Sequence, residues 1–387
     1  MSDRTERATA GSEPPARETA TQGPAPQAAC GTSWETSHRV PTPSIPMSSP
    51  RSASATGSMC SEHPTTSGST ISTCGNSAGP PAATPSPTNG PSRPSTATAS
   101  PSTSPFVQSI TQEYGGGEIY RFDPSFRIRD VGVEDLFLTS AYKSSVDENH
   151  AETAVHMENV EDGWIRRVTT RHYARGIVTI NWAFRVTIED CAVLDPISQI
   201  SGGRRYSFEI NKGSFNLFQR NYARNGRHDY VTGSRVTGPN VFVDSYATKT
   251  HSDNGPHHRY STGLLFDNIL GGDIRTRNRG ASGTGHGWTG GQVMFWNVEA
   301  QRGFEVVNDE PLGTRNWSVG TKGTPRGNAL FELNGQDALP RSLFYRQLED
   351  RVGREQVDRI RTAAQRNGAI HQALIEWAGY GPLDPDY

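Results

Sequence analysis

The stretch LFQRNYARNGRHDYVTGSRVTGPNVFVDSYATKTHSDNGPHHRYSTGLLFDNIL (217–270) decides the fold that we expect for this chain. Short apolar runs begin in it at Leu217, Val241 and Leu264, and no helical spacing connects the apolar residues between them. Similar runs begin outside this stretch at Trp164, Val186 and Val293. Short strands that recur at a period of roughly 20 to 30 residues are typical of a parallel β-solenoid. We therefore predict an all-β fold, a parallel β-helix.

The composition divides the chain into three regions. Residues 1–105 are rich in Ser, Thr, Pro, Ala and Gly, so they cannot bury enough apolar surface to offset chain entropy. We predict a disordered tail there and a parallel β-helix domain over 106–339. From 340 to 387, apolar residues such as Phe344 and Leu348 recur at about helical spacing. We predict a C-terminal helical cap on the end of the solenoid, and a helix that binds a partner is the alternative.

Charge and hydropathy limit the partners and the location that we expect. The formal net charge is −2, which gives no broad attraction to nucleic acid or to a membrane surface, and we predict neither as a partner. The N-terminal sequence MSDRTER lacks the apolar stretch of a secretory signal, and no apolar run is long enough to span a membrane. We expect Cys191, the one cysteine of the predicted β-helix, to be a small buried apolar residue. These features leave the oligomeric state open.

Histidines are concentrated between residues 228 and 286, and some of them stand next to aspartates. His228 with Asp229, and His251 with Asp253, follow their preceding apolar runs by nearly the same number of residues. Adjacent coils stack about 4.7–4.9 Å apart, so we predict that these two His–Asp units lie one above the other on one edge. Polar ladders that only satisfy buried groups are the structural alternative.

Stacked imidazole and carboxylate groups would serve two reactions. In β-elimination, His or Arg would remove the proton beside a uronate carboxylate, and calcium on Asp229 and Asp253, or an arginine, would neutralise that carboxylate. In glycoside hydrolysis, the same two aspartates would flank the bond. The residues predicted to be catalytic are His228, Asp229, His251, Asp253, His258 and Arg259. The residues predicted to bind substrate are Arg204, Arg205, Arg227, Tyr260, Arg275, His286 and Trp288.

Five segments carry a resemblance to a known group of proteins. They are GGRRYSFEI (202–210), GRHDYVTGSRVTGPNVFVDS (226–245), GPHHRYSTGLLFDNI (255–269), GTGHGWTGGQVMFWN (283–297) and RSLFYRQLEDRVG (341–353). Together they resemble microbial right-handed β-helix proteins of the pectin-lyase-like, or pectate-lyase-like, superfamily, over roughly 128–355. The resemblance implies that the predicted fold is a right-handed parallel β-helix, and it implies a carbohydrate-active, extracellular protein that acts on acidic polysaccharides. Lyases, hydrolases, esterases and adhesins share this fold, so the resemblance does not give the reaction.

Local motifs narrow the choice among these reactions and roles only a little. Gly285-His286-Gly287 resembles a motif of polygalacturonase-type hydrolases, whose companion Asn-Thr-Asp, Asp-Asp and Arg-Ile-Lys motifs are absent. Zinc is not expected, because His257 and His258 are adjacent and neither cysteines nor a His-x-x-x-His helix accompany them. Our leading hypothesis is a lyase that cleaves a uronate-containing polysaccharide by β-elimination. The alternatives are a glycoside hydrolase that uses Asp229 and Asp253, and a non-catalytic polysaccharide-binding protein or adhesin.

Overall fold

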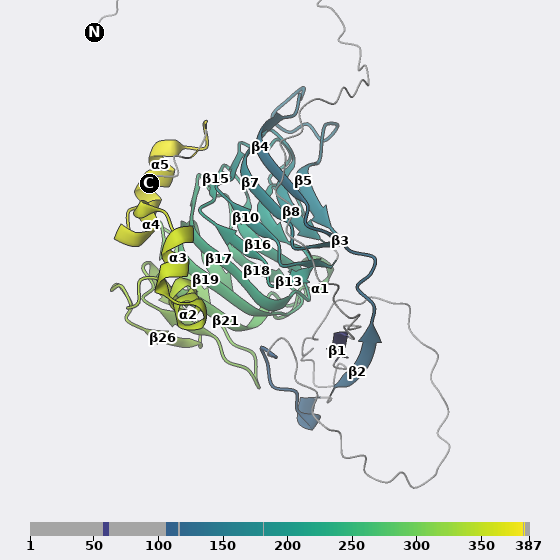
Figure 1. Cartoon of the computed structure of the whole chain (residues 1–387), viewed down its shortest axis with the longest axis vertical. Helices are drawn as coiled ribbons and strands as arrows, with labels where there is room; N and C mark the ends of the chain where they lie inside the picture. The colour runs from purple at the N-terminus through teal and green to yellow at the C-terminus, as the bar shows by residue number, and fades with distance from the viewer. Residues whose placement is uncertain (1–56, 62–105, 115–116, 181, 382, 384–387) are drawn as a thin grey trace, which may run out of the picture. The chain divides into compact units, whose positions relative to one another are not determined.

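Parallel β-strands dominate the structure, with helices concentrated toward the C-terminal end (Figure 1). The computed structural model describes residues 57–61, 106–114, 117–180, 182–381 and 383. The predicted all-β, parallel fold is confirmed within these residues. The predicted tail lies outside the described residues except for β1 (Gly57–Ser61), which pairs antiparallel with β2 (Glu118–Phe122). A short 3-10 helix, Gln112–Tyr114, precedes β2.

One large sheet runs through the successive coils of the solenoid. Among the described residues it has twelve strands, which pair in parallel. These strands are β4 (Gly132–Thr139), β7 (Trp164–Arg171), β10 (Thr187–Glu189), β11 (Ala192–Leu194), β14 (Leu217–Gln219), β15 (Tyr222–Arg224), β17 (Thr237–Thr248), β19 (Ser261–Gly271), β21 (Gly290–Trp296), β22 (Glu299–Ala300), β24 (Trp317–Val319) and β26 (Leu330–Glu332).

Smaller parallel sheets complete the coils. A five-stranded sheet contains β5 (Thr153–Glu158), β8 (Arg175–Ile180), β12 (Tyr206–Ile210), β16 (His228–Ser234) and β18 (Gly255–His258). A four-stranded sheet contains β3 (Ile128–Arg129), β6 (Val160–Glu161), β9 (Ala183–Phe184) and β13 (Gly213–Ser214). A three-stranded sheet contains β20 (Ile274–Thr276), β23 (Glu305–Asn308) and β25 (Thr324–Arg326). An isolated parallel bridge between Asn254 and Ile274 links the end of the five-stranded sheet to the three-stranded one.

A column of apolar side chains fills the inside of the coils. Ile188 is in register with Phe218, Phe218 with Phe242, Phe242 with Phe266 and Phe266 with Phe295. All five are buried in one core cluster. The predicted runs at Leu217 and Val241 do start in register. The run at Leu264 is out by one position, because Val241 pairs with Leu265 and the β17–β19 ladder shifts register after Thr237.

Polar side chains at the turns satisfy backbone N–H groups of neighbouring coils. The side-chain oxygen of Asn216 accepts from the N–H of Val186, and that of Asn240 accepts from the N–H of Asn216, each at 3.0 Å. Asn221 does the same for the N–H of Cys191 at 3.1 Å. Cys191 is fully buried, as expected, and burial raises the pKa of its thiol. These ladders stabilise the turns because a buried N–H without a partner costs free energy.

The C-terminal region is helical, as predicted, but its helices lie on the outer face of the large sheet instead of on the end of the solenoid. They are α2 (Leu343–Val352), α3 (Arg354–Ile360), α4 (Ala363–Asn367) and α5 (Ile370–Trp377). Leu374 and Trp377 pack with Leu194 of β11 and Tyr222 of β15. The outward residues of those strands are apolar, so the helices cover a surface that water would otherwise reach.

Candidate functional site

Four histidines and one aspartate gather beside the last strands of the five-stranded sheet. We call this group the imidazole cluster: His228, Asp253, His257, His258 and His286. The ring centroids of His228 and His257 lie 4.4 Å apart, and those of His257 and His286 lie 5.3 Å apart. His258 and His286 are 4.9 Å apart. His228 begins β16, His257 and His258 end β18, and His286 follows α1 (Ser282–Gly285), so the cluster joins three segments of the chain.

His228 and Asp253 form the innermost pair of the cluster. Nδ1 of His228 lies 2.7 Å from the backbone oxygen of Asp253 and 3.1 Å from its carboxylate Oδ1. Both neighbours are acceptors, so Nδ1 carries a proton. Nε2 of His228 is buried and has no hydrogen-bond partner among the described residues. Burial opposes ionisation of Asp253, but the hydrogen bond from His228 and the charges of His228, Arg277 and Arg279 hold its pKa below the ordinary value.

His257 lies under the guanidinium of Arg279. Nη1 of Arg279 is 2.8 Å from Nδ1 and 2.9 Å from Nε2 of the ring, and 3.0 Å from the backbone oxygen of His257. One atom that is equally close to both ring nitrogens lies over the ring face, which leaves the in-plane lone pair of the imidazole accessible. Burial, followed by the charges of His228 and Arg279, lowers the pKa of His257 to about 2. The ring is therefore uncharged at neutral pH.

His258 and His286 form the outer, half-buried part of the cluster. Nδ1 of each ring has no hydrogen-bond partner in the part of the chain that the structure describes. Burial and the charge of His286 lower the pKa of His258 to about 4, and burial and nearby arginines lower the pKa of His286. Both imidazoles are thus uncharged at neutral pH and able to accept a proton.

Further polar groups surround the cluster. Tyr206 is in register with His228, and their ring centroids are 5.0 Å apart. Cζ of Arg175 lies 5.3 Å from the ring centroid of Tyr206, and Arg175 is paired with the buried Glu209. Nη2 of Arg277 lies 3.7 Å from Oδ2 of Asp253. The surroundings therefore combine uncharged imidazoles with several guanidinium groups.

Gly255 positions the two histidines of β18. Its φ is +122°, a backbone conformation that L side chains rarely adopt, and a Cβ there would lie 2.2 Å from the backbone oxygen of Arg275. The strand stays in register with β16 on either side, since Val231 pairs with Gly255 and Ser234 with His258. Glycine thus lets β18 approach the next coil closely and fixes where its two imidazoles lie.

Asp229 is not part of this cluster. Its side chain is fully buried, and its carboxylate oxygens accept from Ser207 Oγ at 2.6 Å and from Thr250 Oγ1 at 2.7 Å. Burial raises the pKa of Asp229. The predicted stack of two equivalent His–Asp units is therefore replaced by one pair, His228 with Asp253. Calcium at Asp229 and Asp253 stays a prediction.

The structure places most of the other predicted residues in separate contacts. His251 is exposed, with Nε2 at 2.6 Å from Asn225 Oδ1, and Arg259 donates to the backbone oxygen of Thr284 at 2.7 Å. The remaining predicted substrate-binding residues contact the protein itself: Arg204 contacts Glu148, Arg205 contacts Ser198, Arg227 contacts Gly202, Tyr260 contacts Gln108 and Arg275 contacts Asp273. Trp288 is half-buried and bridges to Asn278. Of the predicted set, His228, Asp253, His258 and His286 come together.

Four residues of the site were not predicted from the sequence: Tyr206, His257, Arg277 and Arg279. A signal for two of them was present. The segment RTRNR (275–279) has an arginine at every second position, and successive side chains of an extended segment alternate between its faces. Tyr206 and His257 become neighbours only through the pairing of strands that are distant in sequence, so no local motif marks them.

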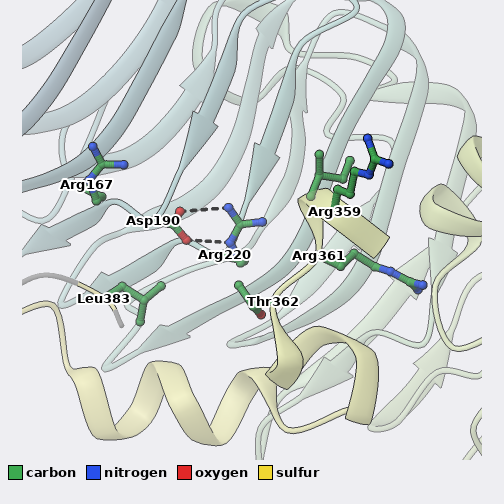
Figure 2. Close-up of a pocket in the computed structure, with 8 residues that line it drawn as sticks. Arg167, Asp190, Arg220, Arg359, Arg361, Thr362 and Leu383 are labelled. Atoms are coloured by element: carbon green, nitrogen blue, oxygen red, sulfur yellow. Dashed lines mark hydrogen bonds and ion pairs between the residues drawn. The ribbon is translucent and has the colours of Figure 1, made fainter. Parts of the chain in front are cut away.

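A separate cavity of about 370 Å³ lies between the large sheet and the C-terminal helices (Figure 2). Its lining residues are Arg167, Asp190, Arg220, Arg359, Ile360, Arg361, Thr362 and Leu383. Arg220 makes two contacts with Asp190, at 2.6 and 2.9 Å, and Arg361 pairs with Glu349 at 3.0 Å. These arginines are engaged in ion pairs of the protein, so the cavity is a weaker candidate for a binding site than the imidazole cluster.

Comparisons with protein-family models, with curated proteins and with solved structures found no match to this chain. Among the described residues, no helix is both long enough and apolar enough to cross a membrane. The long parallel sheets are compatible with a β-helix, as the sequence resemblance implied. The functional argument therefore depends on the geometry of the site.

Proposed function

We propose that this chain cleaves a uronate-containing polysaccharide by β-elimination at the imidazole cluster. The observation that carries the proposal is a group of uncharged imidazoles beside guanidinium groups: His258 is half-buried, and the adjacent, buried His257 contacts Arg279. β-Elimination needs a base for the proton beside the uronate carboxylate, and a cation that neutralises this carboxylate as the proton leaves. Uncharged imidazoles and arginines supply these two functions.

His258 is the proposed base and Arg279 the proposed carboxylate partner. His258 is uncharged at neutral pH, because its pKa is lowered to about 4. Its Nδ1 is buried, so Nε2 is the ring nitrogen that would meet the substrate. It would take the C5 proton of a uronate unit. The C5–H electron pair would then form the C4=C5 double bond as the C4–O bond breaks, and the leaving oxygen would take a proton from water. Arg279 contacts His257, which precedes His258 in the sequence. From this position its guanidinium would contact the substrate carboxylate.

An absorbance assay tests this proposal. The full chain would be incubated with a panel of uronate-containing and neutral polysaccharides, and unsaturated sugar ends would be detected by their ultraviolet absorbance. His258→Ala should lower kcat/KM on a cleaved uronate polymer on the order of 100-fold, the usual contribution of a general base. Arg279→Ala should raise KM and lower kcat, because the carboxylate loses its counter-charge during proton removal.

His156→Ala is the matched control. His156 is an exposed histidine of β5, in the same sheet but in an earlier coil, and it should leave turnover unchanged. Reducing ends without ultraviolet absorbance would instead indicate hydrolysis, and binding without either product would indicate an adhesin. Either result, or full turnover by His258→Ala, would contradict the proposal.

A further inference from the structure

We infer that His228, Asp253 and His257 form a binding site for a divalent transition metal of the zinc class. One potential ligand atom from each residue, a ring nitrogen or a carboxylate oxygen, lies within 4.8 Å of the other two. All three side chains are buried, with exposed fractions of 1%, 7% and 6%. Three residues that converge this closely need only a small inward movement to reach metal–ligand distances of about 2.0–2.2 Å.

The contact between His228 and Asp253 shows which of their atoms can share one ion. Nδ1 of His228 lies 2.7 Å from the backbone oxygen and 3.1 Å from the carboxylate Oδ1 of Asp253. The carboxylate therefore shares an ion with Nδ1, which releases its proton when the ion binds. Nε2 lies on the other edge of the ring, where it is buried and without a partner among the described residues.

The donor set selects the class of metal. Two imidazoles and one carboxylate suit zinc and its neighbours in the first transition row, whereas calcium takes six to eight oxygen ligands. Three protein ligands also leave a coordination position open, as in sites where the metal meets water or substrate. The sequence argued against zinc because no helical His-x-x-x-His motif is present. In the folded chain His228 comes from β16, whereas Asp253 and His257 lie just before and within β18, so that helical spacing rule does not apply.

The neighbouring arginines modulate this site. Arg279 lies over the face of His257, and Arg277 is 3.7 Å from Asp253. Their positive charges oppose a second cation, which should weaken its binding. Removing Arg279 should therefore tighten metal binding. The same variant should impair the proposed lyase reaction, so the two proposals predict opposite effects of one substitution.

Metal titration of the full chain tests the inference without any polysaccharide. Chelator-treated protein would be titrated with Zn²⁺ by calorimetry, and with Co²⁺ by visible absorbance. We expect one ion per chain, and intense Co²⁺ absorption characteristic of four-coordinate sites. Asp253→Asn and His257→Ala should each weaken metal binding by more than about 10-fold. A loss of about 10-fold is already usual when a residue that only hydrogen-bonds to a metal ligand is replaced, and these two residues would bind the metal directly. His156→Ala should bind as the unchanged chain does, and Arg279→Ala should bind more tightly.

Each possible result decides the inference. Weak, octahedral Co²⁺ absorption by the unchanged chain, or Zn²⁺ affinity equal in His257→Ala and the unchanged chain, would overturn it. The first of these measurements does not require any variant to fold. Metal binding without lyase activity would contradict only the proposed lyase reaction. Lyase activity without metal binding would contradict only the proposed metal site.

Discussion

The stacked aromatic column provides the sharpest test of the fold. Phe242 is 1% exposed, and its ring centroid lies 5.0 Å from that of Phe218, 5.1 Å from Phe266 and 5.9 Å from Tyr230. We expect Phe242→Ala to lower the free energy of unfolding strongly, because the coils on both sides lose a packing partner.

The magnitude follows from the packing of this ring. A buried Phe→Ala substitution costs about 3–5 kcal/mol, through lost burial and the cavity that remains. Aromatic pairs contribute about 0.5–1.5 kcal/mol each beyond their buried area, and Phe242 takes part in three such contacts. We therefore expect a loss near the upper end, about 4–5 kcal/mol.

Phe331→Ala is the matched control in the same column. Phe331 lies on the last strand, β26, opposite Ser318, and is only half-buried. We expect a loss of about 1 kcal/mol there, in proportion to the smaller buried area. Urea unfolding followed by circular dichroism would measure both variants, with equal m values as the sign that the comparison is valid. The reasoning fails if the central substitution costs no more than the terminal one.

Three further predictions follow from other buried contacts. Burial and the charge of Asp244 raise the pKa of Asp267 from 3.8 to about 7, so Asp267 is protonated in the folded chain and ionised in the unfolded chain between these pH values. Raising the pH from about 4 to about 7 should therefore lower the free energy of unfolding, by an amount on the order of a few kcal/mol, and Asp267→Asn should flatten this part of the urea-denaturation profile. Gly255→Ala should destabilise the fold by about 1–3 kcal/mol, measured by thermal unfolding, and should reduce any lyase activity. Gly203→Ala is the control and should change neither, because nothing lies within 4 Å of its added Cβ. Arg341→Ala should cost about 3 kcal/mol in urea denaturation, because the fully buried Asp244 loses the guanidinium contacts that it makes at 2.9 Å; an unchanged midpoint would contradict this.

Part of the candidate site was predictable from residue types and spacing. His228 and Asp253 were identified because His–Asp units recur at similar distances after two successive apolar runs, and His258 and His286 because histidines are concentrated between residues 228 and 286. Counting residues along the chain did not show which way a side chain faces, and the predicted stacking of Asp229 on Asp253 depended on that direction. In the folded chain Asp229 is held inside by Ser207 and Thr250.

The alternation of short apolar runs and turns determined the strands, the coils and the apolar column, because burial of one side of each strand is required in every repeat. The tertiary structure alone decided which polar side chains meet. His228 contacts Asp253 and His257 through strand pairing and through the close approach that Gly255 allows. It also decided that the helices cover the outer face of the large sheet and not the end of the solenoid. Such contacts depend on register, turn length and side-chain direction, and a change of one residue in any of these moves a side chain to the opposite face.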